Sequence, residues 1–122
     1  MSKRILCIDD SPTICKLVHK ALDPQGYEVT DAENGRVALD KADASVDMFI
    51  VDVNMPEMDG FAFVEAIKAR SELADKPVVF LTTESSEDKK ERGKTLGVNG
   101  WIVKPFEPEA LVKVVSMLTD QS

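Results

Sequence analysis

The chain has 122 residues, about the size of one domain, and 43% of them are hydrophobic, which is enough to build a core without disulfides or metals. Its 15 basic and 22 acidic residues give a net charge of −7, which repels phosphate backbones and anionic lipids and argues against nucleic acid and membranes as partners. No apolar run approaches the ~20 residues that span a bilayer, so we expect a cytoplasmic protein. Cys7 and Cys15 lack CxxC spacing and nearby histidines for a metal, so we expect free thiols in the core or on a helix face.

Five short apolar runs have the length and composition of β-strands. They are Arg4–Ile8, Glu28–Ala32, Met48–Val51, Pro77–Leu81 and Gly100–Val103. Helical patterns fill the gaps between them. Strict alternation of strand and helix predicts a parallel sheet covered on both faces.

The first helix has a clear predicted start, because Ser11 is a suitable N-cap and Pro12 suits the first helical position. Its apolar stripe is Ile14, Leu17, Val18, Ala21 and Leu22, and it ends near Pro24 and Gly26. His19, the single histidine, falls off this stripe, so we expect it on a solvated face.

Two later helices also show an inward apolar face. The third helix is expected to bury Phe63, Val64 and Ile67, and the last helix begins at Pro108 and carries Leu111, Val114, Val115 and Leu118. The segment Glu84–Gly97 is different, because it is polar nearly all round and has Gly93 inside it. We expect this helix to be among the more mobile parts of the domain.

Five strand and helix repeats are too few for a closed eight-stranded barrel, so the predicted fold is an open doubly wound α/β sheet. We expect the flavodoxin-like type, whose known strand order is 2-1-3-4-5. In this order the first and third strands are neighbours. Asp9 and Asp10 follow the first strand and Asp52 follows the third, so the three acids should meet at the carboxyl edge of the sheet.

Three clustered carboxylates repel one another unless a proton or a cation lies among them. A single aspartate is more simply explained as a helix cap, but three at two strand ends favour a cation site. Oxygen ligands without His or Cys favour Mg²⁺, Mn²⁺ or Ca²⁺ over zinc, and we predict Mg²⁺, for which Mn²⁺ could substitute. At the same edge, Thr82 follows the fourth strand and Lys104 the fifth. A hydroxyl and a cation beside the acids suit a phosphoryl group, with a carboxylate as its acceptor.

Taken together, these residues resemble a known family. DD after the first strand, D in VDVNMPEMDG after the third, T after the fourth and KPF after the fifth look like the receiver domain of CheY-like response regulators of the chemotaxis type. The resemblance covers nearly the whole chain. It implies that Asp52 accepts a phosphoryl group from the phosphohistidine of a histidine kinase.

The resemblance also implies roles for the surrounding residues. The Mg²⁺ ligands would be the Asp10 and Asp52 side chains, the Asn54 backbone carbonyl and, through water, Asp9. Lys104 would pair with phosphoryl oxygens, Thr82 would reorient to hydrogen-bond one of them, and Trp101 occupies the aromatic switch position.

Several further positions would tune the chemistry. The positions that tune the rates of phosphorylation and dephosphorylation are occupied by Asn54, Thr83 and Glu84. From Asn54 and Glu84 we predict a fairly short-lived phosphorylated state. Thr83 stands where a smaller residue is frequent and is predicted to narrow phosphodonor access, and Trp101 stands where Tyr or Phe is usual. The resemblance implies a cis bond before Pro105, although base rates for X-Pro bonds alone favour trans.

After the last helix only Asp120, Gln121 and Ser122 remain, so we expect one receiver domain over residues 1–122 and no output domain. The protein would then act as a monomer and signal by binding a protein target, such as a flagellar motor switch protein. The binding face would be formed by the segments 84–97 and 100–103 and the last helix. A phosphatase would be a further partner. A phosphate sink or a phosphorelay intermediate is an alternative role.

Two readings from other classes fit less well. A Mg²⁺-dependent aspartyl phosphatase usually places DxD after the first strand and carries additional cap residues, whereas this chain has DD and no spare length. A nucleotide-binding or flavin-binding module needs glycines that let the backbone cradle phosphates, and DDSPT has none. We therefore expect a regulatory phosphoacceptor that promotes its own phosphorylation and dephosphorylation, rather than a conventional enzyme.

Overall fold

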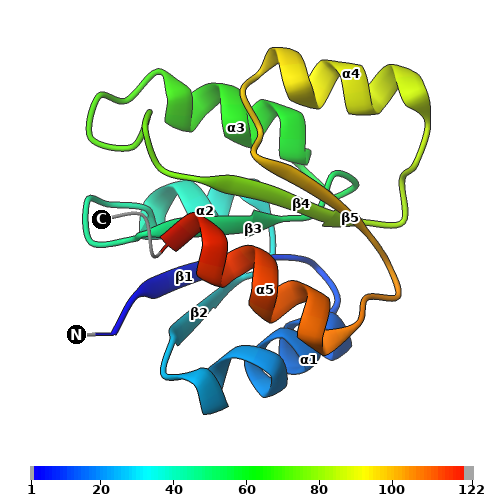
Figure 1. The fold of residues 1–122 in the computed structure, drawn as a ribbon. Helices are drawn as coiled ribbons and strands as arrows, with labels where there is room; N and C mark the ends of the chain where they lie inside the picture. The colour runs from blue at the N-terminus through cyan, green and yellow to red at the C-terminus, as the bar shows by residue number, and fades with distance from the viewer. Residues whose placement is uncertain (1, 120–122) are drawn as a thin grey trace.

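The fold is a five-stranded parallel sheet with helices on both faces, seen in a computed structural model that describes residues 2–119 (Figure 1). The strands are β1 (Arg4–Ile8), β2 (Glu28–Ala32), β3 (Met48–Val51), β4 (Val78–Thr82) and β5 (Gly100–Val103). The helices are α1 (Pro12–Leu22), α2 (Gly35–Lys41), α3 (Gly60–Lys68), α4 (Glu87–Thr95) and α5 (Pro108–Thr119), with a short 3₁₀ turn, η1 (Asp23–Gln25), after α1.

The strand order is β2-β1-β3-β4-β5, which confirms the predicted topology. Every neighbouring pair is parallel, and Ile8 of β1 is in register with Val51 of β3. The chain therefore leaves β1 and β3 side by side at the same edge of the sheet. The expectation that no output domain is present depends on Asp120, Gln121 and Ser122, and these residues lie outside the described residues.

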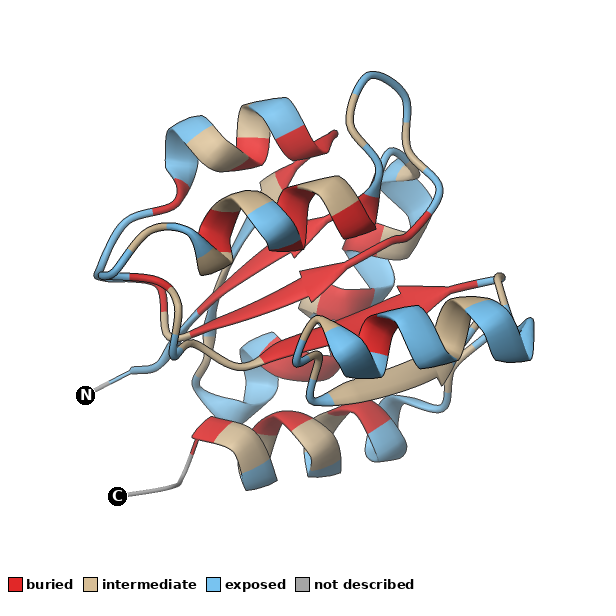
Figure 2. Ribbon diagram, turned by 90° about the horizontal axis from the view of Figure 1, so that it is seen from above, coloured by how far each residue is buried: buried red, intermediate tan, exposed pale blue. Residues whose placement is uncertain are grey.

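The helices divide the core into two layers, one on each face of the sheet. α1 and α5 cover one face, where Val18, Leu22, Leu111 and Val115 pack on Ile50 and its neighbours. α2 and α3 cover the other face, where the buried cluster includes Phe49, Phe61, Phe63, Val64 and Ile67. Figure 2 shows buried residues along the central strands β1, β3 and β4 and on the inner faces of the helices, whereas the edge strands β2 and β5 are less buried.

Polar side chains fix the starts of the helices. Ser11 accepts a hydrogen bond from the N–H of Ile14 at 3.3 Å, which confirms the predicted N-cap of α1. Asp59 accepts from the N–H of Ala62 at 2.8 Å at the start of α3. Each cap satisfies an N–H that has no partner inside its helix.

The packing of α1 departs from the predicted stripe in two places. Leu17 is 45% exposed, because it lies about 100° around the helix from Val18, which faces the sheet most directly. Cys15 is buried in its place. His19 was expected on a solvated face, but its ring is half-buried, and Nε2 lies 2.9 Å from Asp31 Oδ1 on β2.

Two predicted boundaries were slightly wrong. β4 runs from Val78 to Thr82, one residue later than expected, because Pro77 has no N–H to donate and enters the sheet only as an acceptor, from the N–H of Phe49 at 3.0 Å. α4 begins at Glu87 rather than Glu84, because Ser86 caps it. In α4, Gly93 is the buried residue, as expected for a helix with a weak apolar face.

Candidate functional site

Three carboxylates meet at the carboxyl edge of the sheet. Ile8 and Val51, which pair with each other, end β1 and β3, and Asp9 and Asp52 are the residues that follow them. A carboxylate oxygen from each of Asp9, Asp10 and Asp52 lies within 4.8 Å of the others. Asp9 and Asp52 are only 4% and 7% exposed, whereas Asp10 is exposed. The structure thus brings together the three acids that the strand order predicted.

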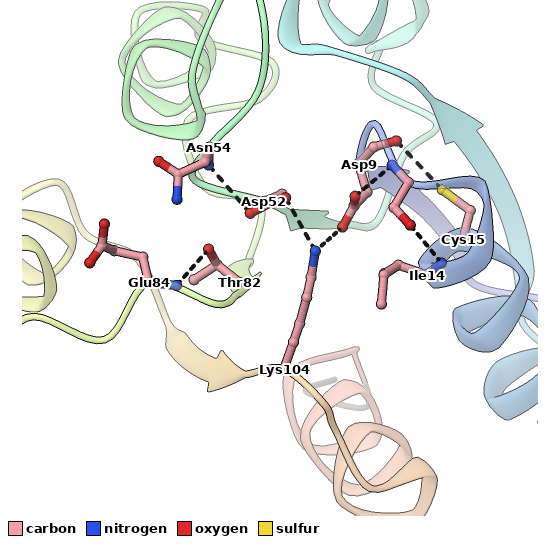
Figure 3. A network of polar contacts seen from close by, with 9 residues as sticks. Asp9, Ile14, Cys15, Asp52, Asn54, Thr82, Glu84 and Lys104 are labelled. Atoms are coloured by element: carbon pink, nitrogen blue, oxygen red, sulfur yellow. Dashed lines mark hydrogen bonds and ion pairs between the residues drawn. The ribbon is translucent and has the colours of Figure 1, made fainter.

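Lys104 lies between the two buried acids (Figure 3). Its Nζ donates to Asp9 Oδ2 at 2.7 Å and to Asp52 Oδ2 at 3.2 Å. The Lys104 side chain is 11% exposed. The Lys104–Pro105 bond is cis, the isomer that the resemblance implies. One ammonium group therefore offsets part of the negative charge of this cluster.

Burial and charge shift the pKa values of two of these groups. Burial raises the pKa of Asp9 above its ordinary value, although Lys104 and the Ser11 N–H stabilise its charged form. Burial lowers the pKa of Lys104, but its hydrogen bond to Asp9 and the charges of Asp52 and Asp9 outweigh burial and raise it overall. Lys104 is therefore fully charged at neutral pH.

Backbone groups orient the two buried carboxylates. The N–H of Ser11 donates to Asp9 Oδ1 at 2.9 Å, and the N–H of Asn54 donates to Asp52 Oδ1 at 3.3 Å. In each case the donor is two residues after the acid, so the turn that ends the strand also positions its carboxylate. Each acid thus presents one oxygen to the backbone and the other to Lys104.

Thr82, at the end of β4, is linked to Trp101 of β5 by hydrogen bonds through Glu84. Thr82 is fully buried, and its Oγ1 accepts from the N–H of Glu84 at 3.1 Å (Figure 3). The carbonyl of Glu84 accepts from Trp101 Nε1 at 2.8 Å. The Glu84 carboxylate pairs with Lys89 at 2.8 Å, and this hydrogen bond lowers the pKa of Glu84. Two hydrogen bonds through Glu84 thus link the Thr82 hydroxyl to the Trp101 indole.

The indole of Trp101 packs closely against the core. It makes an edge contact with Phe80, with ring centroids 5.3 Å apart. Gly93 of α4 allows this packing, because a Cβ there would lie 3.3 Å from Trp101 Cζ3. Thr83, predicted to narrow access to the site, is exposed.

Gly60 supports the site in a way that its sequence position did not reveal. A Cβ on Gly60 would lie 2.4 Å from the backbone oxygen of Asp52. Its N–H also donates to Val53 O at 2.9 Å. The start of α3 therefore packs directly on the backbone that carries Asp52, and only glycine permits this approach.

The acidic cluster fits a hard divalent cation. Its donors are carboxylate oxygens from Asp9, Asp10 and Asp52, and two of these are buried and already oriented by backbone N–H groups. Mg²⁺ and Mn²⁺ prefer such ligands, and Asp10 lies on the side open to solvent, from which an ion would enter.

The comparisons with known proteins agree with this geometry. The model of the response regulator receiver domain matches residues 5–116. The chain belongs to the response regulator receiver domain family. The receiver domain resembles Chemotaxis protein CheY1 of Helicobacter pylori, with 38% identity over 88% of this chain and 90% of that protein. A CheY homologue of Campylobacter jejuni is 35% identical over 88% of this chain and 85% of its own length.

Solved structures of receiver domains have the same fold. The chemotaxis response regulator CheY4 of Vibrio cholerae superposes with a TM-score of 0.90 at 45% identity, covering 97% of this chain and 99% of that one. Receiver domains of this type are regulatory proteins rather than conventional enzymes. Within residues 2–119, no helix combines the length and apolar character needed to cross a bilayer.

Proposed function

We propose that this receiver domain accepts a phosphoryl group on Asp52 from the phosphohistidine of a histidine kinase. The observation that carries the proposal is the meeting of three carboxylates and the Lys104 ammonium at one edge of the sheet. An Asp52 oxygen attacks phosphorus, the P–N bond breaks, and the imidazole nitrogen keeps the electron pair. Water later hydrolyses the acyl phosphate, which releases phosphate and restores the carboxylate.

The residues present could hold Mg²⁺ for this reaction. Asp10 and Asp52 would bind the ion by their side chains, Asn54 by its backbone carbonyl and Asp9 through water. When bound, Mg²⁺ would neutralise charge that develops on the phosphoryl oxygens. Mn²⁺ offers the same ligand preferences.

Lys104 and Thr82 supply the remaining contacts to the phosphoryl group. Lys104 already lies 3.2 Å from Asp52 Oδ2, so a small movement of its ammonium reaches oxygens attached to that side chain. Thr82 would exchange its hydrogen bond with the Glu84 N–H for a phosphoryl oxygen. Because the Glu84 carbonyl holds the Trp101 indole, this exchange would alter the surface around Trp101.

Residues at the mouth of the site set the lifetime of the phosphorylated state. The side chain of Asn54 is exposed beside Asp52, and Glu84 lies two residues after Thr82. In this role the side chains of Asn54 and Glu84 would orient a water toward the acyl phosphate. We propose that these residues keep the phosphorylated state fairly short-lived.

The output is proposed to be binding to a protein through the face made by α4, β5 and α5. Trp101 and Val103 lie on β5, and Val103 is 43% exposed. Relatives named as chemotaxis proteins support a flagellar motor switch protein as the target. Phosphate sink or phosphorelay roles would use the same Asp52 chemistry without such a target.

Labelling with acetyl phosphate tests the phosphoacceptor. The wild-type protein with Mg²⁺ should form an adduct of about 80 Da that is labile to hydroxylamine, as expected for an acyl phosphate. Asp52→Asn should form none, whereas Asp40→Asn, at an exposed aspartate of α2, should label normally. An unchanged adduct on Asp52→Asn, or no Mg²⁺-dependent adduct on wild type, would refute the proposal.

A further inference from the structure

A second cluster of potential metal ligands lies on the α1 face of the sheet. The Sγ atoms of Cys7 and Cys15 and a carboxylate oxygen of Asp31 all lie within 4.8 Å of one another. Cys7 of β1 is in register with Asp31 of β2, so their side chains leave the same face of the sheet. α1 packs over that face and adds Cys15.

The cluster has both an enclosed side and an open side. Cys7 and Cys15 are 1% and 7% exposed, whereas the Asp31 side chain is 45% exposed. A hollow of about 420 Å³ is lined by Cys15 and Asp31, together with Asp10 and Lys41. An ion can therefore enter past Asp31 and reach Cys15, whereas Cys7 does not line the hollow.

The groups around the cluster already orient its ligands. His19 follows Cys15 by one helical turn, and its Nε2 lies 2.9 Å from Asp31 Oδ1. Lys41 donates from Nζ to the backbone oxygen of Asp31 at 2.5 Å, which brings a positive charge close to the cluster. Cys15 Sγ donates to the Asp9 carbonyl at 3.7 Å (Figure 3), and metal binding would replace this bond with a metal–sulfur bond. Metal ligands are commonly held by such surrounding hydrogen bonds.

We propose that Cys7, Cys15 and Asp31 form a binding site for a thiophilic divalent cation of the Zn²⁺ class. Two thiolates and one carboxylate oxygen supply three ligands of a tetrahedron, and water supplies the fourth from the open side. Each thiol releases its proton to solvent as its sulfur binds the metal. Metal–sulfur distances of about 2.3 Å require only small movements of atoms that already lie this close.

The two clusters select different ions. The cluster of Asp9, Asp10 and Asp52 offers oxygen alone, whereas this site offers mainly sulfur, which hard ions such as Mg²⁺ bind poorly. A metal held here would fasten α1 to β1 and β2, close to the turn that carries Asp9. The proposal does not depend on phosphoryl transfer, so the two can fail separately.

Co²⁺ is the probe, because thiolate ligands give it intense near-ultraviolet charge-transfer absorption that oxygen ligands do not. The reduced wild-type protein, kept in a phosphine reductant with excess Mg²⁺, should develop this band with one equivalent of Co²⁺, and Zn²⁺ should abolish it. Asp52→Asn, which alters only the acidic cluster, should retain the band. Cys15→Ala should lose it.

Two further variants distinguish a built site from an accidental thiol contact. Asp31→Asn should keep the thiolate band but weaken affinity by about ten-fold or more, and His19→Gln should weaken it by about ten-fold through lost orientation of Asp31. If circular dichroism shows that Cys15→Ala folds poorly, Cys7→Ala takes its place and should also lose the band. The proposal is overturned if the reduced wild type shows no band, whether because no metal binds or because Cys7 and Cys15 form a disulfide instead. It is also overturned if the band persists in both Cys7→Ala and Cys15→Ala.

Discussion

The Nζ atom of Lys104 lies 2.7 Å from Asp9 Oδ2, although 95 positions separate the two residues in the chain. The same ammonium reaches Asp52 Oδ2 at 3.2 Å. Asp9, Asp52 and Lys104 follow three different strands, so only the assembled sheet edge makes this ion pair possible. Lys104 thus acts as an internal counter-ion of the acidic cluster.

Removal of this counter-ion should destabilise the fold at neutral pH. Lys104→Met leaves two nearly buried carboxylates without a cation, and we expect the free energy of unfolding to fall by about 2 kcal/mol, less than for a fully enclosed pair. Urea denaturation measures the change. Lys89→Met removes a solvent-screened ion pair and should have little effect. Equal losses in both variants would contradict the role of Lys104.

The same pair predicts how stability depends on alkaline pH. Asp9 and Asp52 raise the pKa of Lys104 above its ordinary value of 10.5, so its stabilising contribution is complete below pH 10.5 and is lost as pH rises through the folded-state pKa. Above pH 10.5, wild type should lose stability more steeply than Lys104→Met. Parallel curves for the two proteins, from urea denaturation at several pH values, would contradict this assignment.

Gly60 should tolerate no larger residue. In Gly60→Ala the new Cβ would meet the Asp52 backbone oxygen at 2.4 Å, so α3 or the strand end must move. We expect a loss of about 2 kcal/mol or more in the free energy of unfolding, as for an overpacked core. Gly100→Ala is the control, because its Cβ would have its nearest contact at an ordinary 3.4 Å and should cost less than about 1 kcal/mol. Similar losses in both variants would argue against the close approach.

Trp101 should report phosphorylation by its fluorescence. The Thr82 hydroxyl accepts from the Glu84 N–H, and the Glu84 carbonyl accepts from the indole at 2.8 Å. Reorientation of Thr82 should therefore change the emission when acetyl phosphate and Mg²⁺ are added. The response should be smaller in Thr82→Ala and absent in Asp52→Asn. A full response in Thr82→Ala would show that the signal reaches Trp101 by another route.

Thr83 should limit the access of phosphodonors to Asp52. It is exposed and immediately follows Thr82, the buried residue that ends β4. Thr83→Ala should accept phosphate from acetyl phosphate several-fold faster than wild type, measured from the time course of adduct formation. Thr95→Ala, at an exposed threonine on α4, should label at the wild-type rate. A Thr83→Ala rate equal to or below that of wild type would contradict the prediction.

Sequence patterns predicted the fold and most of the acidic site. Apolar runs that end in Asp9, Asp52 and Lys104 indicate strands whose carboxyl ends carry the chemistry, and strict alternation with helices implies a parallel sheet. Because all strands point the same way, these residues must share one edge. The N-cap Ser11 was equally readable, since capping depends on neighbours a few positions away.

Contacts between distant groups could not be predicted from local patterns. The contact of Lys104 with Asp9, the close approach of Gly60 to Asp52 and the meeting of Cys7, Cys15 and Asp31 all join separate elements. Their distances depend on how helices are rotated and seated on the sheet, and those angles come from side-chain packing across the whole core. Local patterns specify which residues reach an edge or a face, whereas packing determines the few ångströms that separate them there.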